Sequence, residues 1–184
     1  MVTVFARKIK FQVMDILDNY KTDNFGLKLK KEECDLNDII ESATENVNYF
    51  IKQKNIQLVY NAERCVVFID AYIIERVITN LLSNSIKYSQ NDGFIEIVVK
   101  RINIDYVEIK FIDNGIGIEK NKLERVFNKF EKINRQNNEI IQSTGMGLAF
   151  CKMAVEAHGG KIYLDSVENK GTTVSLILYF ADEQ

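Results

Sequence analysis

Three polar side chains between residues 80 and 88 have a spacing that could support chemistry. Asn80, Asn84 and Lys87 are four and three residues apart, so a helix would place two amides and a cation on one face. Amide oxygens suit Mg²⁺, which fills most of its coordination shell with phosphate oxygens and water, and a lysine one turn away suits the same phosphates. The alternative is that the three residues form only the solvated face of a helix. The opposite stripe is apolar and is expected to be buried: Ile73, Val77, Ile78, Leu81 and Leu82.

Asp113 follows a segment that alternates as a strand does. Val107, Ile109 and Phe111 fall on one face of that strand, and the aspartate stands where the strand leaves the sheet. Two glycines follow at positions 115 and 117, and they permit positive φ or a close approach of the backbone to a flat ligand. An ionised carboxylate is only an acceptor, which suits an exocyclic amino group such as that of adenine. A simple Asp-Asn-Gly turn is the alternative.

Gly145 and Gly147 precede an apolar helical run that includes Phe150 and Met153. Both glycines therefore fall at the expected N-terminus of a helix, where free backbone N–H groups and the positive end of the helix dipole form an anion site. A loop that enters a helix explains this pair equally well on its own. The three motifs nevertheless occur in one order within one domain, and their conjunction is far more specific than any one of them.

Together these motifs resemble the catalytic ATP-binding domain of sensor histidine kinases, within the superfamily that includes type II topoisomerases, MutL-type repair proteins and the ninety-kilodalton chaperone. The resemblance runs from about residue 27 to the C-terminus. It implies a Bergerat-type fold, an α+β two-layer sandwich with a mixed, mostly antiparallel sheet and helices on one face. It also implies ATP and Mg²⁺ as ligands, and a lid over the nucleotide at about residues 131–144, a polar stretch without a periodic apolar face.

The helix motif resembles the N box of that family. The resemblance implies Asn84 as the Mg²⁺ ligand, Lys87 as a phosphate contact and Tyr88 as an aromatic neighbour of the adenine. Asn80 occupies the position at which the ATP-hydrolysing relatives have a glutamate that prepares water for attack. An amide does not take up a proton at neutral pH, so this chain lacks that general base. The motif thus indicates phosphoryl transfer to another group rather than fast hydrolysis.

The other family motifs account for the remaining candidate site residues. Lys132 falls where the family has an arginine or lysine that reaches the terminal phosphate. Ser143 occupies a position that is often glycine, which indicates a less freely hinged lid on that side. The implied set is Asp113, Gly115 and Gly117 in the first glycine box, Phe127, Phe130 and Lys132 in the F box, Gly145, Gly147 and Leu148 in the second glycine box, and Gly171 and Thr172 in the closing motif.

The acceptor for phosphoryl transfer is not evident in this chain. His158 is its single histidine and precedes two glycines, which is typical of a helix C-terminus and not of a nucleophile. Residues 1–26 carry an apolar stripe at spacings of three and four, which resembles the second helix of a kinase dimerisation hairpin. The alternative is an extra helix that folds back on the domain. The expected domains are thus a helical remnant at 1–26 and the ATP-binding domain at 27–184.

Composition fits a single domain with this appendage. The chain has 184 residues, of which 46% are hydrophobic, enough for one core. Its net charge of −2 offers no general attraction for nucleic acid. Cys34, Cys65 and Cys151 lack metal-like spacing and are expected to be free thiols in a reducing compartment. No signal peptide or membrane span is evident, so we expect a cytoplasmic location and place the spans of any membrane-anchored parent sensor outside this chain.

The expected elements interleave without strict alternation. Asp35 and Asp70 are expected to cap the helices that follow them. The predicted order is a strand at 27–31, a helix at 36–52, strands at 57–60 and 66–69, the N-box helix, a hairpin of strands 94–101 and 104–112, a helix after residue 147, and strands at 161–167 and 172–180.

The resemblance implies a phosphoryl-donor domain of a two-component sensor histidine kinase. Its expected partners are ATP, an acceptor-histidine and dimerisation hairpin, and a response regulator, with a homodimer possible in the full-length parent. Two other functions stay open from the sequence. One is an ATPase or serine kinase of the same superfamily, and the other is a regulatory or docking module that has kept the fold and lost turnover.

Overall fold

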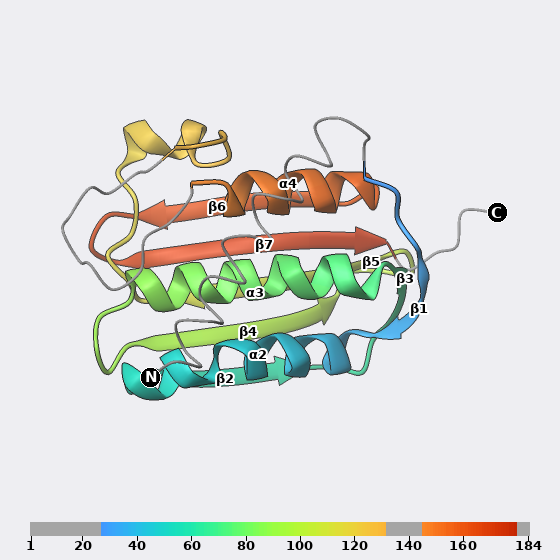
Figure 1. Ribbon diagram of the computed structural model, residues 1–184, viewed down its shortest axis with the longest axis horizontal. Helices are drawn as coiled ribbons and strands as arrows, with labels where there is room; N and C mark the ends of the chain where they lie inside the picture. Colours follow the sequence, from blue (N-terminus) through green and yellow to red (C-terminus); the bar gives the residue numbers. More distant parts are fainter. Residues whose placement is uncertain (1–26, 132–144, 180–184) are drawn as a thin grey trace, which may run out of the picture.

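A computed structural model describes residues 27–131 and 145–179, which form a sheet with helices packed on one face (Figure 1). The strand order is β2-β4-β5-β7-β6, and every neighbouring pair is antiparallel except β2 and β4, which are parallel. This is the predicted two-layer α+β architecture with a mixed, mostly antiparallel sheet. The strands are β2 (Gln57–Ala62), β4 (Phe94–Arg101), β5 (Tyr106–Asp113), β6 (Lys161–Val167) and β7 (Gly171–Tyr179).

The helices begin where the sequence predicted caps. They are α2 (Leu36–Gln53), α3 (Ala71–Tyr88) and α4 (Gly147–Ala157). A short 3-10 helix, η1 (Lys120–Arg125), lies between β5 and α4 in the sequence. Asp35 accepts a hydrogen bond from the backbone N–H of Asn37, and Asp70 accepts one from that of Ile73. Each cap satisfies a donor that the first turn of a helix leaves without an intrahelical partner, which fixes where the helix starts.

A second, two-stranded sheet joins β1 (Glu32–Asp35) to β3 (Val66–Ile69) in antiparallel register. The strand predicted at residues 27–31 is wrong, because pairing begins only at Glu32, opposite Ile69. Before that point the backbone N–H of Lys30 is bound by the Asp70 carboxylate at 2.8 Å instead of by a strand. The Asp70 carboxylate therefore accepts the hydrogen bond that a backbone carbonyl of a neighbouring strand would accept if residues 27–31 were a strand.

The core lies between the sheet and the helices. Val107, Ile109 and Phe111 of β5 are each at most 1% exposed, which confirms the predicted alternation. They belong to the same cluster as the apolar stripe of α3, of which only Ile73 is partly exposed. The stripe confines α3 to one rotation about its axis, so the polar face that carries Asn80 and Asn84 points away from this core.

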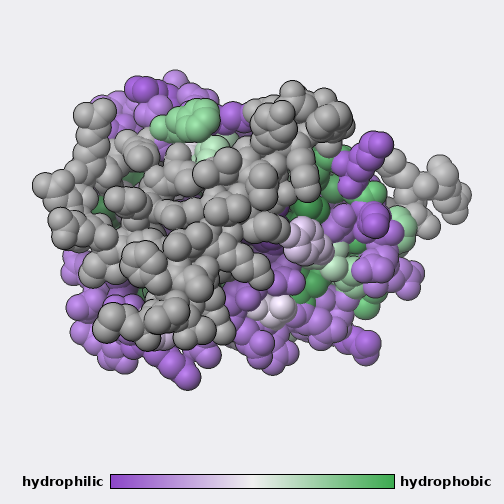
Figure 2. Space-filling model, in the orientation of Figure 1, coloured by the Kyte–Doolittle hydropathy of each residue, from purple (hydrophilic) through white to green (hydrophobic). Residues whose placement is uncertain are grey.

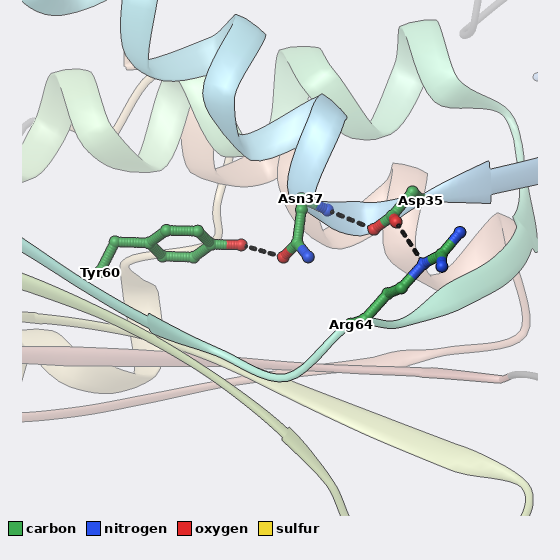
Figure 3. A network of polar contacts seen from close by, with 4 residues as sticks. All are labelled: Asp35, Asn37, Tyr60 and Arg64. Atoms are coloured by element: carbon green, nitrogen blue, oxygen red, sulfur yellow. Dashed lines mark hydrogen bonds and ion pairs between the residues drawn. The ribbon is translucent and has the colours of Figure 1, made fainter.

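The N-terminus of α2 is tied to β2 and to the loop after it (Figure 3). The hydroxyl of Tyr60 donates to the side-chain oxygen of Asn37, and Arg64 Nε lies 3.3 Å from the Asp35 carboxylate. Burial, with the charge of Asp35 nearby, raises the pKa of Tyr60 to about 12, so this hydroxyl remains a donor. The network anchors α2 at the end where β1 enters it.

The surface is largely hydrophilic where Figure 2 shows described residues, and hydrophobic side chains gather towards the end that carries β1 and β3. The exposed large hydrophobic residues include Val66 of β3 and, between β4 and β5, Ile102 and Ile104. Within the two described ranges, no helix is both long and apolar enough to span a membrane.

His158 caps the C-terminus of α4, as its position before two glycines predicted. It is 5% exposed, its Nδ1 lies 2.7 Å from the carbonyl oxygen of Ala154, and its Nε2 accepts from the backbone N–H of Asp70 at 3.0 Å. Because Nε2 accepts, the ring is neutral and carries its proton on Nδ1. Burial lowers the pKa of His158, outweighing the opposing effect of the Ala154 carbonyl.

We expect the free energy of unfolding to fall as the pH drops below the ordinary histidine pKa of 6.5. The unfolded chain then binds a proton that the folded chain excludes, so the contribution of His158 is complete above that pH and is lost below it. Urea unfolding at about pH 7.5 and about pH 5.5 measures the loss. His158→Gln should show a smaller loss, and an equal loss in both proteins would contradict the assignment. The raised pKa of Asp113 changes the free energy of unfolding with pH in the opposite direction. This contribution is the same in both proteins, so it cancels when their losses are compared.

Candidate functional site

Asp113 is the last residue of β5 and lies between β4 and β7. It pairs with Ile95 on one side and with Thr172 on the other, and it is 8% exposed. Its Oδ2 accepts from the hydroxyl of Ser85 at 3.0 Å, and its Oδ1 accepts from the backbone N–H of Gly115 at 2.9 Å. Two donors from different elements therefore hold the carboxylate in one orientation.

Burial raises the pKa of Asp113, while hydrogen bonds from Gly115, Ser85 and the backbone of Thr172 act in the opposite direction. The donors compensate part of the cost of burying the charge. A carboxylate of this kind gains most from a further N–H donor, because little water competes for its free lone pairs. Asp113 can thus recognise a buried amino group.

The polar face of α3 carries the predicted N-box residues. Asn80, Asn84, Lys87 and Tyr88 are all partly exposed, whereas the apolar stripe on the other side is buried. The Nζ of Lys87 lies 4.8 Å from the centroid of the Tyr88 ring, a cation–π contact. The structure therefore places two amides, an ammonium and an aromatic ring along the C-terminal half of one helix, accessible from outside the core.

The first glycine motif packs against the end of α3. The backbone N–H of Ile116 donates to the carbonyl of Tyr88 at 3.1 Å, and a Cβ on residue 115 would lie only 2.7 Å from that same oxygen. Any side chain larger than hydrogen at Gly115 would push the loop away from the helix. Gly117 takes a φ of +64° beside Val167, so the loop also reaches the β6–β7 hairpin. The motif thus joins Asp113 to the N box.

The second glycine motif starts α4. Met146 precedes the helix without a side-chain cap, and Gly147 is the first helical residue, with Leu148 after it. A Cβ on Gly147 would lie 3.8 Å from the side-chain amide of Asn80. The N-terminus of α4 therefore lies next to the polar face of α3, and the glycine at position 147 has no side chain to separate them. Its backbone donors and positive dipole end are placed for an anion next to the N box.

The F-box aromatics lie on the α4 side of the site. The Nζ of Lys152 is 5.9 Å from the centroid of the Phe127 ring, and the backbone N–H of Phe130 donates to the carbonyl of Gly145 at 2.9 Å. Phe130 has a φ of +63° and is 70% exposed. Lys132 and most of the predicted lid, residues 132–144, lie outside the described residues.

The closing motif borders Asp113 directly. Gly171 opens β7, and Thr172 is the strand partner of Asp113. Ser166, which the sequence reasoning missed, accepts from the backbone N–H of Ile118 at 2.9 Å, donates to the carbonyl of Gly171 at 2.8 Å and lies 2.9 Å from Thr172 Oγ1. The same reasoning missed Ser85. Its signal was a polar residue on the buried stripe, four positions after Leu81.

The donor set fits Mg²⁺ held jointly with a phosphate ligand. Among the described residues, no group of three or more His, Cys, Asp or Glu side chains could hold a metal by itself. Mg²⁺ takes few protein ligands and completes its octahedron with water and phosphate oxygens, so a single amide such as Asn84 is sufficient. Asn84 shares its helix face with Lys87, which suits the same phosphates.

The fold and this arrangement define an ATP-binding domain, and the comparisons agree. The chain belongs to the family of histidine kinase-, DNA gyrase B- and HSP90-like ATPases, whose model matches residues 69–182.

Individual relatives are sensor kinases. "Sensor protein kinase WalK" of Staphylococcus saprophyticus is 32% identical over 167 residues, which cover 90% of this chain and 27% of that protein. The chain thus spans about a quarter of that relative's length. The catalytic domain of histidine kinase ThkA superposes with a TM-score of 0.71 at 26% identity, over 82% of this chain and 96% of that one. ThkA in complex with response regulator protein TrrA has the same fold, with a TM-score of 0.77 at 21% identity over 98% of this chain and 50% of that one.

Proposed function

We propose that this domain binds Mg-ATP and donates its terminal phosphoryl group to a histidine as part of a two-component sensor histidine kinase. The observation that carries the proposal is the Asp113 carboxylate, buried and oriented by Ser85 and Gly115 beside the helix that carries the N box. A buried acceptor next to amides, an ammonium and an uncapped helix start offers one site for adenine and one for phosphates.

Each group has a role in this proposal. Asp113 accepts from the adenine amino group, and Tyr88 lies beside the ring. Asn84 holds Mg²⁺, which would supply positive charge at the phosphates when bound. Lys87 and Lys132 contact phosphates. The remaining contributors supply backbone donors or line the nucleotide: Gly115, Gly117, Phe127, Phe130, Gly145, Gly147, Leu148, Gly171 and Thr172.

Asn80 favours transfer over hydrolysis. It lies next to the N-terminus of α4, where a Cβ on Gly147 would be 3.8 Å from its amide. An amide at this place can orient a neighbour by hydrogen bonding but has no basic site for a proton from water. Phosphoryl transfer demands mainly positioning of the reactants and neutralisation of phosphate charge, which the side chains and backbone donors of this site would supply.

The acceptor histidine and the partners lie outside the described site in this proposal. His158 is buried with both ring nitrogens engaged, which argues against a nucleophilic role. We place the acceptor on a dimerisation hairpin that residues 1–26 continue, and a response regulator downstream. Residues 27–184 then form the catalytic domain, with its lid at about 131–144. The parent is a membrane-anchored homodimeric sensor with this domain in the cytoplasm.

Calorimetric titration with ADP and ATP, each with and without Mg²⁺, tests the binding step, with GTP as the control. We expect saturable binding that prefers adenine and tightens with metal. Radiolabelled Mg-ATP and a separate acceptor hairpin then test transfer, and we expect an acid-labile label on histidine. Acid-stable label on serine would contradict the kinase assignment. Absence of nucleotide binding would favour a docking module, and steady hydrolysis without any partner would favour an ATPase.

Asn84→Ala should remove the benefit of Mg²⁺ for ATP binding. The substitution deletes the proposed protein ligand, so the ratio of ATP affinities with and without Mg²⁺ should fall by about tenfold, the lower end of what disrupting a metal site costs. The matched control is Asn48→Ala, which removes the same side chain from an exposed position on α2. Calorimetry of both variants measures the ratio. A Mg²⁺ effect that survives in Asn84→Ala would remove Asn84 from the metal site.

A further inference from the structure

Lys54, just after α2, reaches the C-terminus of α3. Its Nζ donates to the carbonyl oxygens of Ile86 at 2.7 Å, Lys87 at 3.1 Å and Ser89 at 2.7 Å. An ammonium has three donors, and each one is matched here by a carbonyl. The last carbonyls of a helix have no intrahelical partner and carry the negative end of the helix dipole. Lys54 therefore caps α3 from a different helix.

The neighbouring carbonyls of this turn also have donors. The carbonyl of Ser85 accepts from the backbone N–H of Ser89 at 2.9 Å and from its hydroxyl at 2.7 Å. The carbonyl of Tyr88 accepts from the backbone N–H of Ile116, in the first glycine motif. Every backbone carbonyl from residue 85 to residue 89 thus accepts a hydrogen bond. These carbonyls accept six hydrogen bonds in total, and Lys54 donates three of them.

Lys54 is itself held in place. Its backbone N–H donates to the carbonyl of Phe50 at 3.1 Å, and its own carbonyl accepts from the backbone N–H of Asp92 at 2.8 Å. The side-chain amide of Asn55 donates to the Asp92 carboxylate at 2.7 Å. The turn after α2 is therefore fastened to the turn after α3. Burial lowers the pKa of Lys54, and the convergent carbonyls offset that loss of hydration.

We propose that Lys54 is a positioning residue for nucleotide binding. It fixes the last turn of α3, so that Lys87 and Tyr88 are presented to the ligand. This role rests on the function proposed above. Lys54 contacts the backbone of the turn and acts through it. Because Tyr88 also receives the hydrogen bond from Ile116, the same turn transmits the constraint to the loop that orients Asp113.

Lys54→Met tests the role, because methionine keeps an apolar stem of similar length and removes all three donors. We expect the affinities for ADP and Mg-ATP to fall by about fivefold, which is less than the tenfold or more for one charged hydrogen bond made to the ligand itself, because Lys54 acts only through the turn. Lys52→Met is the matched control: it removes the same charge from an exposed position in the last turn of α2 and should leave affinity unchanged. Lys54→Arg keeps the charge and several donors, so it should recover part of the affinity.

A double-mutant cycle with Lys87→Ala separates positioning from general stability. Because Lys54 acts partly through Lys87, Lys54→Met should lower affinity by less in the Lys87→Ala background, about two- to threefold, where only the contributions of Tyr88 and of the loop that orients Asp113 remain. Amide exchange of Ile116 without nucleotide should also accelerate in Lys54→Met, because its acceptor lies in the released turn. An undiminished effect in the Lys87→Ala background, or unchanged exchange at Ile116, would overturn the inference. Absence of nucleotide binding by the unmodified chain would instead overturn the proposed function, and this role with it.

Discussion

Replacing Asp113 with asparagine is expected to lower the affinity for ADP and ATP by about ten- to a hundredfold, because it removes a charge-assisted hydrogen bond worth about 1.5–3 kcal/mol. The carboxylate is held by Ser85 and Gly115 and is 8% exposed, so little water is available to replace the lost interaction. The asparagine oxygen can still accept from Gly115, and burial no longer penalises a charge. The new NH₂ group, however, cannot accept from the Ser85 hydroxyl, so the two effects on the free energy of unfolding oppose each other and the fold should survive. Calorimetric titration with ADP measures the affinity, and urea unfolding measures the stability.

Asp165→Asn is the matched control for this substitution. It removes the same charge from an exposed residue of β6 and should leave both quantities unchanged. If Asp113→Asn binds ADP as tightly as the unmodified chain, adenine does not lie against this carboxylate and the nucleotide placement must be revised.

Gly171→Ala should destabilise the fold by about 3 kcal/mol, the combined scale of a residue forced into positive φ and of overpacking against a neighbour. Gly171 has a φ of +119°, and a Cβ there would lie 1.9 Å from the carbonyl oxygen of Asp113. That oxygen belongs to the backbone of a central strand, so it cannot rotate away as a side chain would. Urea unfolding at neutral pH measures the cost.

Gly159→Ala separates the two contributions. Gly159 also has a positive φ, of +78°, but a Cβ there meets only the Tyr179 ring, at 3.6 Å, an ordinary contact. We expect it to cost about 1 kcal/mol, the conformational part alone. Equal costs at the two glycines would mean that the contact with Asp113 is relieved by movement of β7.

Local rules were sufficient for most elements. Asp35 and Asp70 cap their helices, the alternation of β5 buries Phe111, and His158 ends α4. These features depend on neighbours within a few residues, so the sequence contains their determinants. The error at residues 27–31 has a different origin. Whether that segment pairs depends on β3 and on the Asp70 carboxylate, forty positions from Lys30.

The candidate site also contains some residues that the sequence pointed to and others that only the folded structure revealed. Residue types, spacing and the family resemblance selected Asn84, Lys87, Asp113 and the glycines as candidates, because metal, phosphate and amino-group chemistry requires particular functional groups. Ser85, Ser166 and Lys54 were missed, since their partners are brought to them only by folding. A serine or a lysine has no local signature for a contact that it makes across two elements.

The sequence by itself determined the chemistry available to this protein and the helices and strands that carry it, because side-chain type, periodicity and capping are local properties. The tertiary structure decided how those groups meet. Only the sheet register places Thr172 beside Asp113, and only the packing of α2 against α3 brings Lys54 to the end of the N-box helix. Both depend on long-range pairing, whose free energy is spread over the whole core and is not encoded at any one position.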